Sequence, residues 1–226
     1  MDIKLHYIEK GTGFPLILLH GNGENSEYFE HQIAYFSNKY RVIAIDTRGH
    51  GRSPRGEAPF TIRQFAEDLY EFLRMHKIEK AHFLGFSDGG NIALCFALKY
   101  PEYVDHLILN GANLNSKGVK FGVQLPIEIG YRIASVFGKR DERARKNAEM
   151  LGLMVNDPNV KKEELRNLKM PVLVIAGTKD MIRKSHTRMI YERLCNAELV
   201  LLKGDHFIAA KEADAFNRSV EQFLNK

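Results

Sequence analysis

Three residues far apart in this sequence, Ser87, Asp180 and His206, have side chains that together could perform nucleophilic chemistry. A serine hydroxyl is a weak nucleophile at neutral pH and needs a neighbouring base to take its proton. That base is usually a histidine, and a buried carboxylate fixes the tautomer of its ring and stabilises the imidazolium. The three residue types and their order along the chain therefore predict acyl transfer by a serine nucleophile.

The segment around Ser87 has the pattern of a nucleophile elbow. A short apolar stretch ends in Gly85-Phe86-Ser87-Asp88-Gly89 and continues as a helix with almost no polar face. A sharp strand-to-helix turn holds the serine in a strained conformation and exposes its hydroxyl. Gly85 and Gly89 leave room for the chain to double back, and the helix N-terminus favours negative charge beside Ser87. Gly-x-Ser-x-Gly by itself is a weak pattern, and the flanking strand and helix make it specific.

The elements that must position these residues follow a strand–helix rhythm. Residues 3–8 alternate like a half-exposed strand, and each later apolar run ends at once in a polar or glycine cluster. These runs are residues 15–19, 42–45, the segment before Ser87, 107–109, 171–176 and 199–202. Continuous apolar strands are typical of a parallel sheet, whose carboxyl ends share one edge. The pattern predicts an α/β fold with a mostly parallel sheet, helices on both faces and the three reactive side chains at one edge.

The rhythm stops after Asn113 and resumes near Lys169. Between them lie only helical patterns, at residues 127–137 and 141–155. We expect a core of residues 1–113 and 170–226, with a short helical cap at 114–169 inserted after the strand that ends near Asn110.

Composition points to one soluble globular unit. The chain has 226 residues, of which 44% are hydrophobic and 27% charged. No apolar run approaches the length of a spanning helix, and the N-terminus lacks the pattern of a signal peptide. Cys95 and Cys195 are predicted to be reduced thiols of a cytoplasmic protein. We expect no zinc site, because no Cys/His cluster has zinc-site spacing.

The positive charge of the chain is concentrated in the predicted cap. Residues 115–169 contain twelve Lys or Arg and seven Asp or Glu, which accounts for the whole net charge of +5. A basic patch can attract nucleic acid or another anion. Solvated helix faces explain the charge more simply, so we expect no nucleic-acid partner and no membrane partner. The sequence does not predict the oligomeric state.

Taken from end to end, the chain resembles the cap-bearing α/β-hydrolase family. The resemblance rests on five motifs in the family's order: His20-Gly21-Asn22-Gly23, Asp46-Thr47-Arg48-Gly49-His50-Gly51, Gly85-Phe86-Ser87-Asp88-Gly89-Gly90, Ile175-Ala176-Gly177-Thr178-Lys179-Asp180 and Gly204-Asp205-His206-Phe207. The chain starts at what resembles the family's second strand, so the family's antiparallel edge strand is expected to be missing. The predicted cap is also shorter than in many members.

The resemblance implies a role for each site residue. Ser87 would be the nucleophile, Asp180 the acid and His206 the base. The backbone N–H groups of Asn22 and Asp88 would form the oxyanion hole. The implied activity is hydrolysis of small to medium carboxylic esters through an acyl-enzyme, with no metal and no organic cofactor.

Other residues could compete for these roles. His186 is a weaker candidate for the base because it follows Asp180 too closely to lie at another strand end. Asp205 adjoins His206 and is poorly placed to face it. The preceding strand end, where some relatives carry the acid, holds Asn110 and Asn113. His20 is expected to brace the oxyanion loop, and the turn from Arg48 to Gly51 to be structural.

The same site is compatible with other functions. A lactonase, a carbon–carbon bond hydrolase, a thioesterase or a perhydrolase could use the same residues. A ligand sensor without catalysis is a further alternative, but such a protein can lose one of the three residues without cost, so the presence of all three argues against it. The Asp88 carboxylate could pair with an ammonium group on a substrate, or it could bond locally at the helix start.

Overall fold

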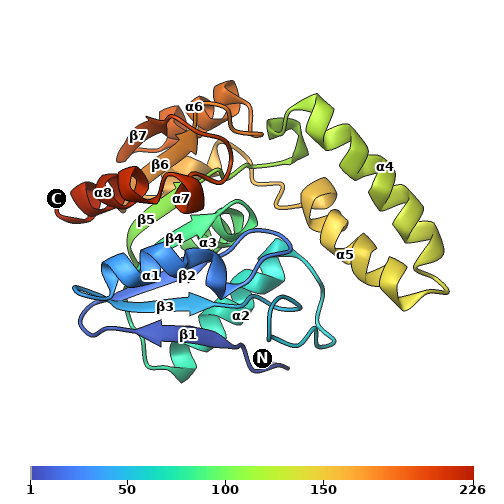
Figure 1. Ribbon diagram of the computed structural model, residues 1–226, viewed down its shortest axis with the longest axis horizontal. Helices are drawn as coiled ribbons and strands as arrows, with labels where there is room; N and C mark the ends of the chain where they lie inside the picture. Colours follow the sequence, from blue (N-terminus) through green and yellow to red (C-terminus); the bar gives the residue numbers. More distant parts are fainter. Residues whose placement is uncertain (1) are drawn as a thin grey trace.

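The computed structural model describes residues 2–226, and its centre is a seven-stranded sheet with the order β1-β3-β2-β4-β5-β6-β7 (Figure 1). The strands are β1 (Tyr7–Lys10), β2 (Pro15–Leu19), β3 (Arg41–Ile45), β4 (Ala81–Phe86), β5 (Val104–Asn110), β6 (Val172–Gly177) and β7 (Ala197–Leu202). All neighbouring strands from β3 to β7 pair in parallel, as predicted for an α/β fold.

The expectation of a missing antiparallel edge strand is wrong. Strand β1 lies at the edge of the sheet and pairs antiparallel with β3, with Tyr7 opposite Ile45 and Lys10 opposite Val42. It begins at Tyr7, later than the alternating pattern of residues 3–8 predicts. An edge strand is held by one neighbour only, so its limits depend on pairing with β3 more than on its own sequence.

Helices pack on both faces of the sheet and also form the segment between β5 and β6. The α-helices are α1 (Glu30–Phe36), α2 (Ile62–Met75), α3 (Asp88–Lys99), α4 (Phe121–Phe137), α5 (Glu142–Asn156), α6 (Lys184–Arg193), α7 (Ile208–Lys211) and α8 (Ala213–Leu224). Short 3-10 helices are η1 (Ser26–Phe29), η2 (Pro101–Tyr103), η3 (Ser116–Gly118) and η4 (Glu164–Asn167). Thr61 is the N-cap of α2, because its side chain accepts a hydrogen bond from the Gln64 N–H.

Alternating strand residues divide the core into two layers. In β2, Ile17 and Leu19 face the layer that contains α2 and α3, whereas Leu16 and Leu18 face the layer that contains α1 and α8. The same alternation continues across the central strands, so both faces of the sheet are buried.

The topology has a switch point at the carboxyl edge of the sheet. After β2 the chain moves to one side to form β3 and then crosses to the other side to form β4. The helices that follow β2 and β4 lie on opposite faces of the sheet, and open α/β sheets bind ligands at such switch points.

Helices α4 and α5 stand apart from the two layers of the core, as a hairpin beside the carboxyl edge of the sheet (Figure 1). Helix α4 begins at Phe121, six residues earlier than predicted, and contains Pro126. The position of these helices between β5 and β6 agrees with an inserted helical segment, and the cap limits of 114 and 169 stay a prediction. Within residues 2–226, no helix combines the length and apolar character needed to cross a bilayer.

Candidate active site

Ser87 lies at the turn between β4 and α3 with a backbone conformation that few side chains adopt. Its φ of 53° and ψ of −118° are held by two backbone hydrogen bonds, from its own N–H to Asn110 and from the Asn91 N–H to its carbonyl. A Cβ on Gly85 would lie 2.2 Å from the Gly89 carbonyl oxygen, and one on Gly89 would lie 1.9 Å from the Leu19 carbonyl oxygen. The turn therefore requires glycine at both positions, as the sequence pattern predicts.

The structure brings Ser87, His206 and Asp180 into one row of hydrogen bonds. His206 Nε2 lies 3.0 Å from Ser87 Oγ, and His206 Nδ1 lies 2.7 Å from Asp180 Oδ1. A carboxylate can only accept, so the Nδ1–H donates to Asp180 and Nε2 is left to accept the Ser87 hydroxyl proton. His206 and Asp180 are buried, whereas Ser87 is partly exposed. This is the geometry that serine nucleophiles require.

Two glycines let the loops that carry the acid and the base approach each other. Gly111 follows β5 with a φ of +63°, and a Cβ there would lie 2.8 Å from His206 Cε1. A Cβ on Gly177 would lie 1.9 Å from the Asp205 carbonyl oxygen, so the end of β6 touches the backbone of the histidine loop. The Ile182 N–H donates to Asp180 Oδ1 at 2.8 Å and helps to orient the carboxylate.

His20 braces the loop after β2, as expected. Its Nδ1–H donates to the Gly21 carbonyl at 2.7 Å, and its Nε2 accepts from the Thr47 N–H at 3.0 Å. Burial lowers the pKa of His20 to about 4, so the ring is neutral at neutral pH. Within residues 2–226, the N–H groups of Asn22 and Asp88 donate to no other protein group, which leaves both free for an oxyanion.

The Asp88 carboxylate is held locally. It accepts from Asn22 Nδ2 at 2.9 Å and from Asn91 Nδ2 at 3.2 Å, and the residue is buried. Burial raises the pKa of Asp88 above its ordinary value. This arrangement favours the local role of Asp88 over pairing with a substrate ammonium group.

A second carboxyl group, Glu24, lies close to the triad. Its Oε2 accepts from the Gly21 N–H at 3.1 Å, and the electrostatic influence of His206 reaches it. Burial raises the pKa of Glu24 to about 7. The sequence analysis did not identify Glu24, although its place three residues after Gly21 in the oxyanion loop was a usable signal.

The competing residues have other partners. His186 Nε2 accepts from the Leu114 N–H at 3.0 Å, so this histidine fixes the loop that leads from β5 to the cap. Asp205 accepts from the Phe207 N–H and pairs with Lys211. Asn110 is fully buried at the end of β5, where an acid would otherwise stand. The geometry thus leaves Asp180 and His206 as the partners of Ser87.

An open cleft of about 400 Å³ lies between the α4–α5 hairpin and the core, and its lining includes Phe60, Tyr131, Arg145, Glu149 and Asp157. Ser87 and His206 are not part of this lining. Burial, with a smaller influence of Asp88, raises the pKa of Asp157 to about 6.

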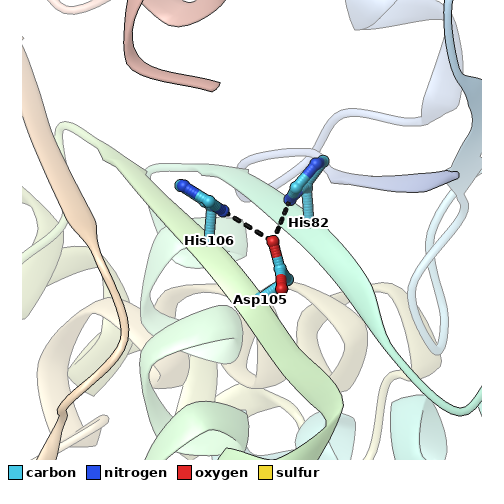
Figure 2. A group of neighbouring side chains, drawn as sticks. All are labelled: His82, Asp105 and His106. Atoms are coloured by element: carbon cyan, nitrogen blue, oxygen red, sulfur yellow. Dashed lines mark hydrogen bonds and ion pairs between the residues drawn. The ribbon is translucent and has the colours of Figure 1, made fainter. Parts of the chain in front are cut away.

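A separate polar cluster lies at the opposite edge of the sheet. The register between β4 and β5 shifts after Ala81, so that His82 on β4 lies opposite both Asp105 and His106 on β5. Figure 2 shows the three side chains directed toward one another. His106 Nδ1 and His82 Nδ1 lie 2.7 Å and 3.4 Å from the same oxygen, Asp105 Oδ2.

These three side chains are of types that bind divalent metals, and their ligand atoms lie within 4.8 Å of one another. However, the Lys80 ammonium lies 3.1 Å from the other Asp105 oxygen and already balances the carboxylate charge. The cluster therefore contains one ion pair, between Lys80 and Asp105, and a hydrogen bond between Asp105 and His106. Burial lowers the pKa of His82 to about 4, so its ring is neutral at neutral pH. The sequence analysis did not find this cluster, because His82 meets Asp105 and His106 only through the shift in register between β4 and β5.

Comparison with known proteins agrees with this architecture. The profile of the alpha/beta hydrolase fold family matches residues 15–128. Human serine hydrolase BPHL is 30% identical over 251 aligned residues, covering 98% of this chain and 83% of the relative. The 3-oxoadipate enol-lactonase 2 of Acinetobacter baylyi is 28% identical, covering 100% of this chain and 94% of the relative.

A solved structure, the enol-lactonase from Burkholderia xenovorans LB400, matches the fold with a TM-score of 0.83. Its identity is 23%, and the match covers 99% of this chain and 97% of that one. The chain belongs to the α/β hydrolase family and has the family's fold. It is a hydrolase by this relationship.

Proposed function

We propose that this protein is a serine hydrolase that cleaves carboxylic esters through an acyl-enzyme. The observation that carries the proposal is the continuous row from Ser87 Oγ through His206 to Asp180. The strained turn at Ser87 supports it, because such strain persists where a reactive group must be exposed.

The first half of the reaction forms the acyl-enzyme. His206 takes the Ser87 proton while Oγ attacks the ester carbonyl, and Asp180 stabilises the resulting imidazolium. The oxyanion would accept hydrogen bonds from the N–H groups of Asn22 and Asp88. The loss of one such donor costs roughly 3–4 kcal/mol of transition-state stabilisation. The carbon–oxygen bond then breaks, and the departing alcohol takes its proton from His206.

The second half hydrolyses the acyl-enzyme. His206 removes a proton from water, the hydroxide attacks the same carbonyl, and the bond to Ser87 breaks as His206 returns the proton to Oγ. His206 carries every proton in both halves of the reaction. In this proposal the partner is a small-molecule ester, and the mechanism has no step that needs a metal or a cofactor.

A second candidate is hydrolysis of lactones. A lactone is a cyclic ester, so the same residues would open it, and the alcohol would stay attached to the product. The 3-oxoadipate enol-lactonase 2 of Acinetobacter baylyi supports this candidate, since its similarity extends over the whole chain. A panel of linear esters and lactones compared by kcat/KM separates the two.

Replacement of the nucleophile tests the mechanism. Ser87→Ala should lower the turnover of p-nitrophenyl acetate by roughly 10⁴-fold or more and abolish labelling by a fluorophosphonate probe. Ser219→Ala, on the distant helix α8, is the matched control and should behave as the wild type. A folded Ser87→Ala protein that keeps substantial activity would refute the assignment. An unlabelled wild type would favour a ligand sensor.

A further inference from the structure

Helix α4 exposes a row of large apolar side chains to solvent. Among residues 2–226, six of the ten exposed large apolar side chains belong to this one helix, with exposed fractions of 40–68%. They are Phe121, Leu125, Ile129, Ile133, Val136 and Phe137, called here the α4 stripe. The first four recur every fourth residue, and Val136 and Phe137 extend the row by a further turn. The stripe is about 24 Å long.

An ordinary surface helix buries its apolar face and exposes its polar one, whereas α4 also carries large apolar side chains on its exposed side. Val123, Ile127 and Tyr131 are partly buried. The buried residues of α4 are Gln124 and Ala134, and Gln124 donates to the Met154 carbonyl of α5. A Cβ on Gly122, within the stripe, would contact nothing within 4 Å. In Figure 1, α4 is the outermost element of the cap and lies beyond α5. An apolar patch of this kind marks a contact surface.

Cations surround the stripe. The exposed side chains of Lys117 and Lys120 precede Phe121, and those of Lys139 and Arg140 follow Phe137. Arg132 is exposed in the middle of the helix. Among the nearest acids, Glu142 pairs with Lys146. Glu128 and Asp141 accept hydrogen bonds from uncharged groups and keep their charge, so the five cations remain in excess. The partner of this face is therefore both apolar and negatively charged.

We propose that the α4 stripe docks on the surface of an anionic lipid bilayer. A helix that lies in the interface buries its apolar side chains at the boundary of headgroups and acyl chains. Lysine and arginine beside it reach the lipid phosphates, and each adds attraction to an anionic leaflet. The α4 stripe provides the apolar row, and the cations at both of its ends provide the electrostatic contacts. This proposal replaces our sequence-based expectation of no membrane partner.

Charge favours a lipid surface over a second copy of the chain. If two stripes packed across a twofold axis in an antiparallel arrangement, Lys117 and Lys120 would face the partner's Lys139 and the partner's Arg140. In a parallel arrangement identical cationic ends would meet. Like charges lie opposite each other in both cases, which opposes association. An anionic surface complements both ends at once.

Vesicle flotation with the full chain tests the proposal. The probes are vesicles of phosphatidylcholine alone and of phosphatidylcholine with phosphatidylglycerol. We expect the wild type to float with the anionic vesicles, and its bound fraction to fall as salt rises from about 50 to about 300 mM. The double variant Ile129→Asp with Ile133→Asp should lower the partition coefficient roughly tenfold or more. Met75→Asp, which places a charge at an exposed apolar position outside the cap, is the matched control and should bind as the wild type.

A second variant separates the electrostatic contribution. Arg132→Gln with Lys139→Gln and Arg140→Gln should remove most of the preference for anionic vesicles while the stripe stays intact. Melting temperature and ester turnover, measured for each variant, verify that it is folded. Absence of wild-type binding to anionic vesicles would overturn the proposal. A dimer detected by light scattering, which the two aspartates dissociate, would also overturn it and assign the stripe to a second copy.

Discussion

The geometry around Ser87 depends on backbone hydrogen bonds and on glycines that take no part in the reaction. A non-glycine residue with φ of 53° costs roughly 1–3 kcal/mol, and here the hydrogen bonds of β5 and α3 hold it in place. Gly111 has the same kind of role, since it gives the imidazole of His206 its space. The reactive side chains are therefore positioned by backbone that only glycine can provide.

Gly111→Ala should lower kcat strongly while the protein stays folded. The new methyl group would meet His206 Cε1 at 2.8 Å, and alanine is strained at a φ of +63°. We expect a loss of about 10²-fold, because small misplacements of a catalytic group cost that much. Ester kinetics together with the melting temperature check it. Gly122→Ala, where a methyl group would enter open space, should leave kcat unchanged.

Glu24 should make the stability of the protein depend on pH. The pKa of Glu24 is about 7 in the folded chain, against an ordinary value of 4.5, so the folded state binds more protons between these values. Stability therefore falls as pH rises from about 4.5 to 7 and is then level with respect to this group. Glu24→Gln removes this loss and keeps an oxygen that can accept from Gly21.

Thermal unfolding at several pH values tests this assignment. The gain in melting temperature from Glu24→Gln should be larger at pH 8 than at pH 5. An equal gain at both values would mean that Glu24 titrates normally. Glu27→Gln, at an exposed position on η1, is the control and should show no such difference.

At the scale of elements, the cap hairpin is fastened to the core mainly through α5. Arg55 donates to both oxygens of Glu149, at 2.9 Å and 2.6 Å. At the next residue of α5, the Met150 carbonyl accepts a hydrogen bond from Asn22 Nδ2 at 2.9 Å. The hydrogen bond between Asn22 and Met150 joins α5 directly to the loop proposed to hold the oxyanion. A movement of α5 would therefore displace that loop.

Glu149→Gln should loosen the cap without unfolding the core. A bidentate arginine–carboxylate pair is stronger than an ordinary surface pair, but both side chains here are partly exposed. We expect about 1 kcal/mol of lost local stability and faster trypsin cleavage between residues 114 and 169, with little change in the global melting temperature. Glu142→Gln breaks only the pair with Lys146 inside the cap and is the control. Equal cleavage rates in both variants would contradict a fastening role for Glu149.

At the scale of the whole molecule, Arg48 connects segments that are distant in the chain. Its guanidinium is fully buried, donates twice to Asp68 of α2 at 2.7 Å, and also reaches Asp2 near the N-terminus. This agrees with the expectation that the Arg48 turn is structural. The turn ties the N-terminal segment, the loop after β3 and α2 into one unit.

Asp68→Asn should therefore destabilise the entire fold. Removal of one partner leaves a buried guanidinium incompletely neutralised, which costs about 3 kcal/mol. Urea unfolding should show a lower midpoint with an unchanged slope. Glu67→Gln is the control, because it changes only the neighbouring exposed pair with Lys99. Its free energy of unfolding should change by less than about 1 kcal/mol. A similar shift for both variants would contradict the role assigned to Arg48.

The sequence by itself was sufficient to predict the α/β fold and to single out Ser87, Asp180 and His206. Apolar runs mark buried parallel strands, and all such strands end at one edge, so residues after them must converge wherever the chain folds in this way. The turn glycines at positions 85 and 89 could be predicted as well, because their need is local.

Only the tertiary structure decided the features that depend on non-local neighbours. Each of three features needs a partner distant in the chain: the pairing of β1 with β3, the shift in register beside His82, and the hydrogen bond from Asn22 to Asp88. The raised pKa of Glu24 depends on burial, which no single residue reveals. The outward face of α4 is the clearest case. Helical periodicity locates an apolar stripe but does not tell whether the core, another molecule or solvent lies against it.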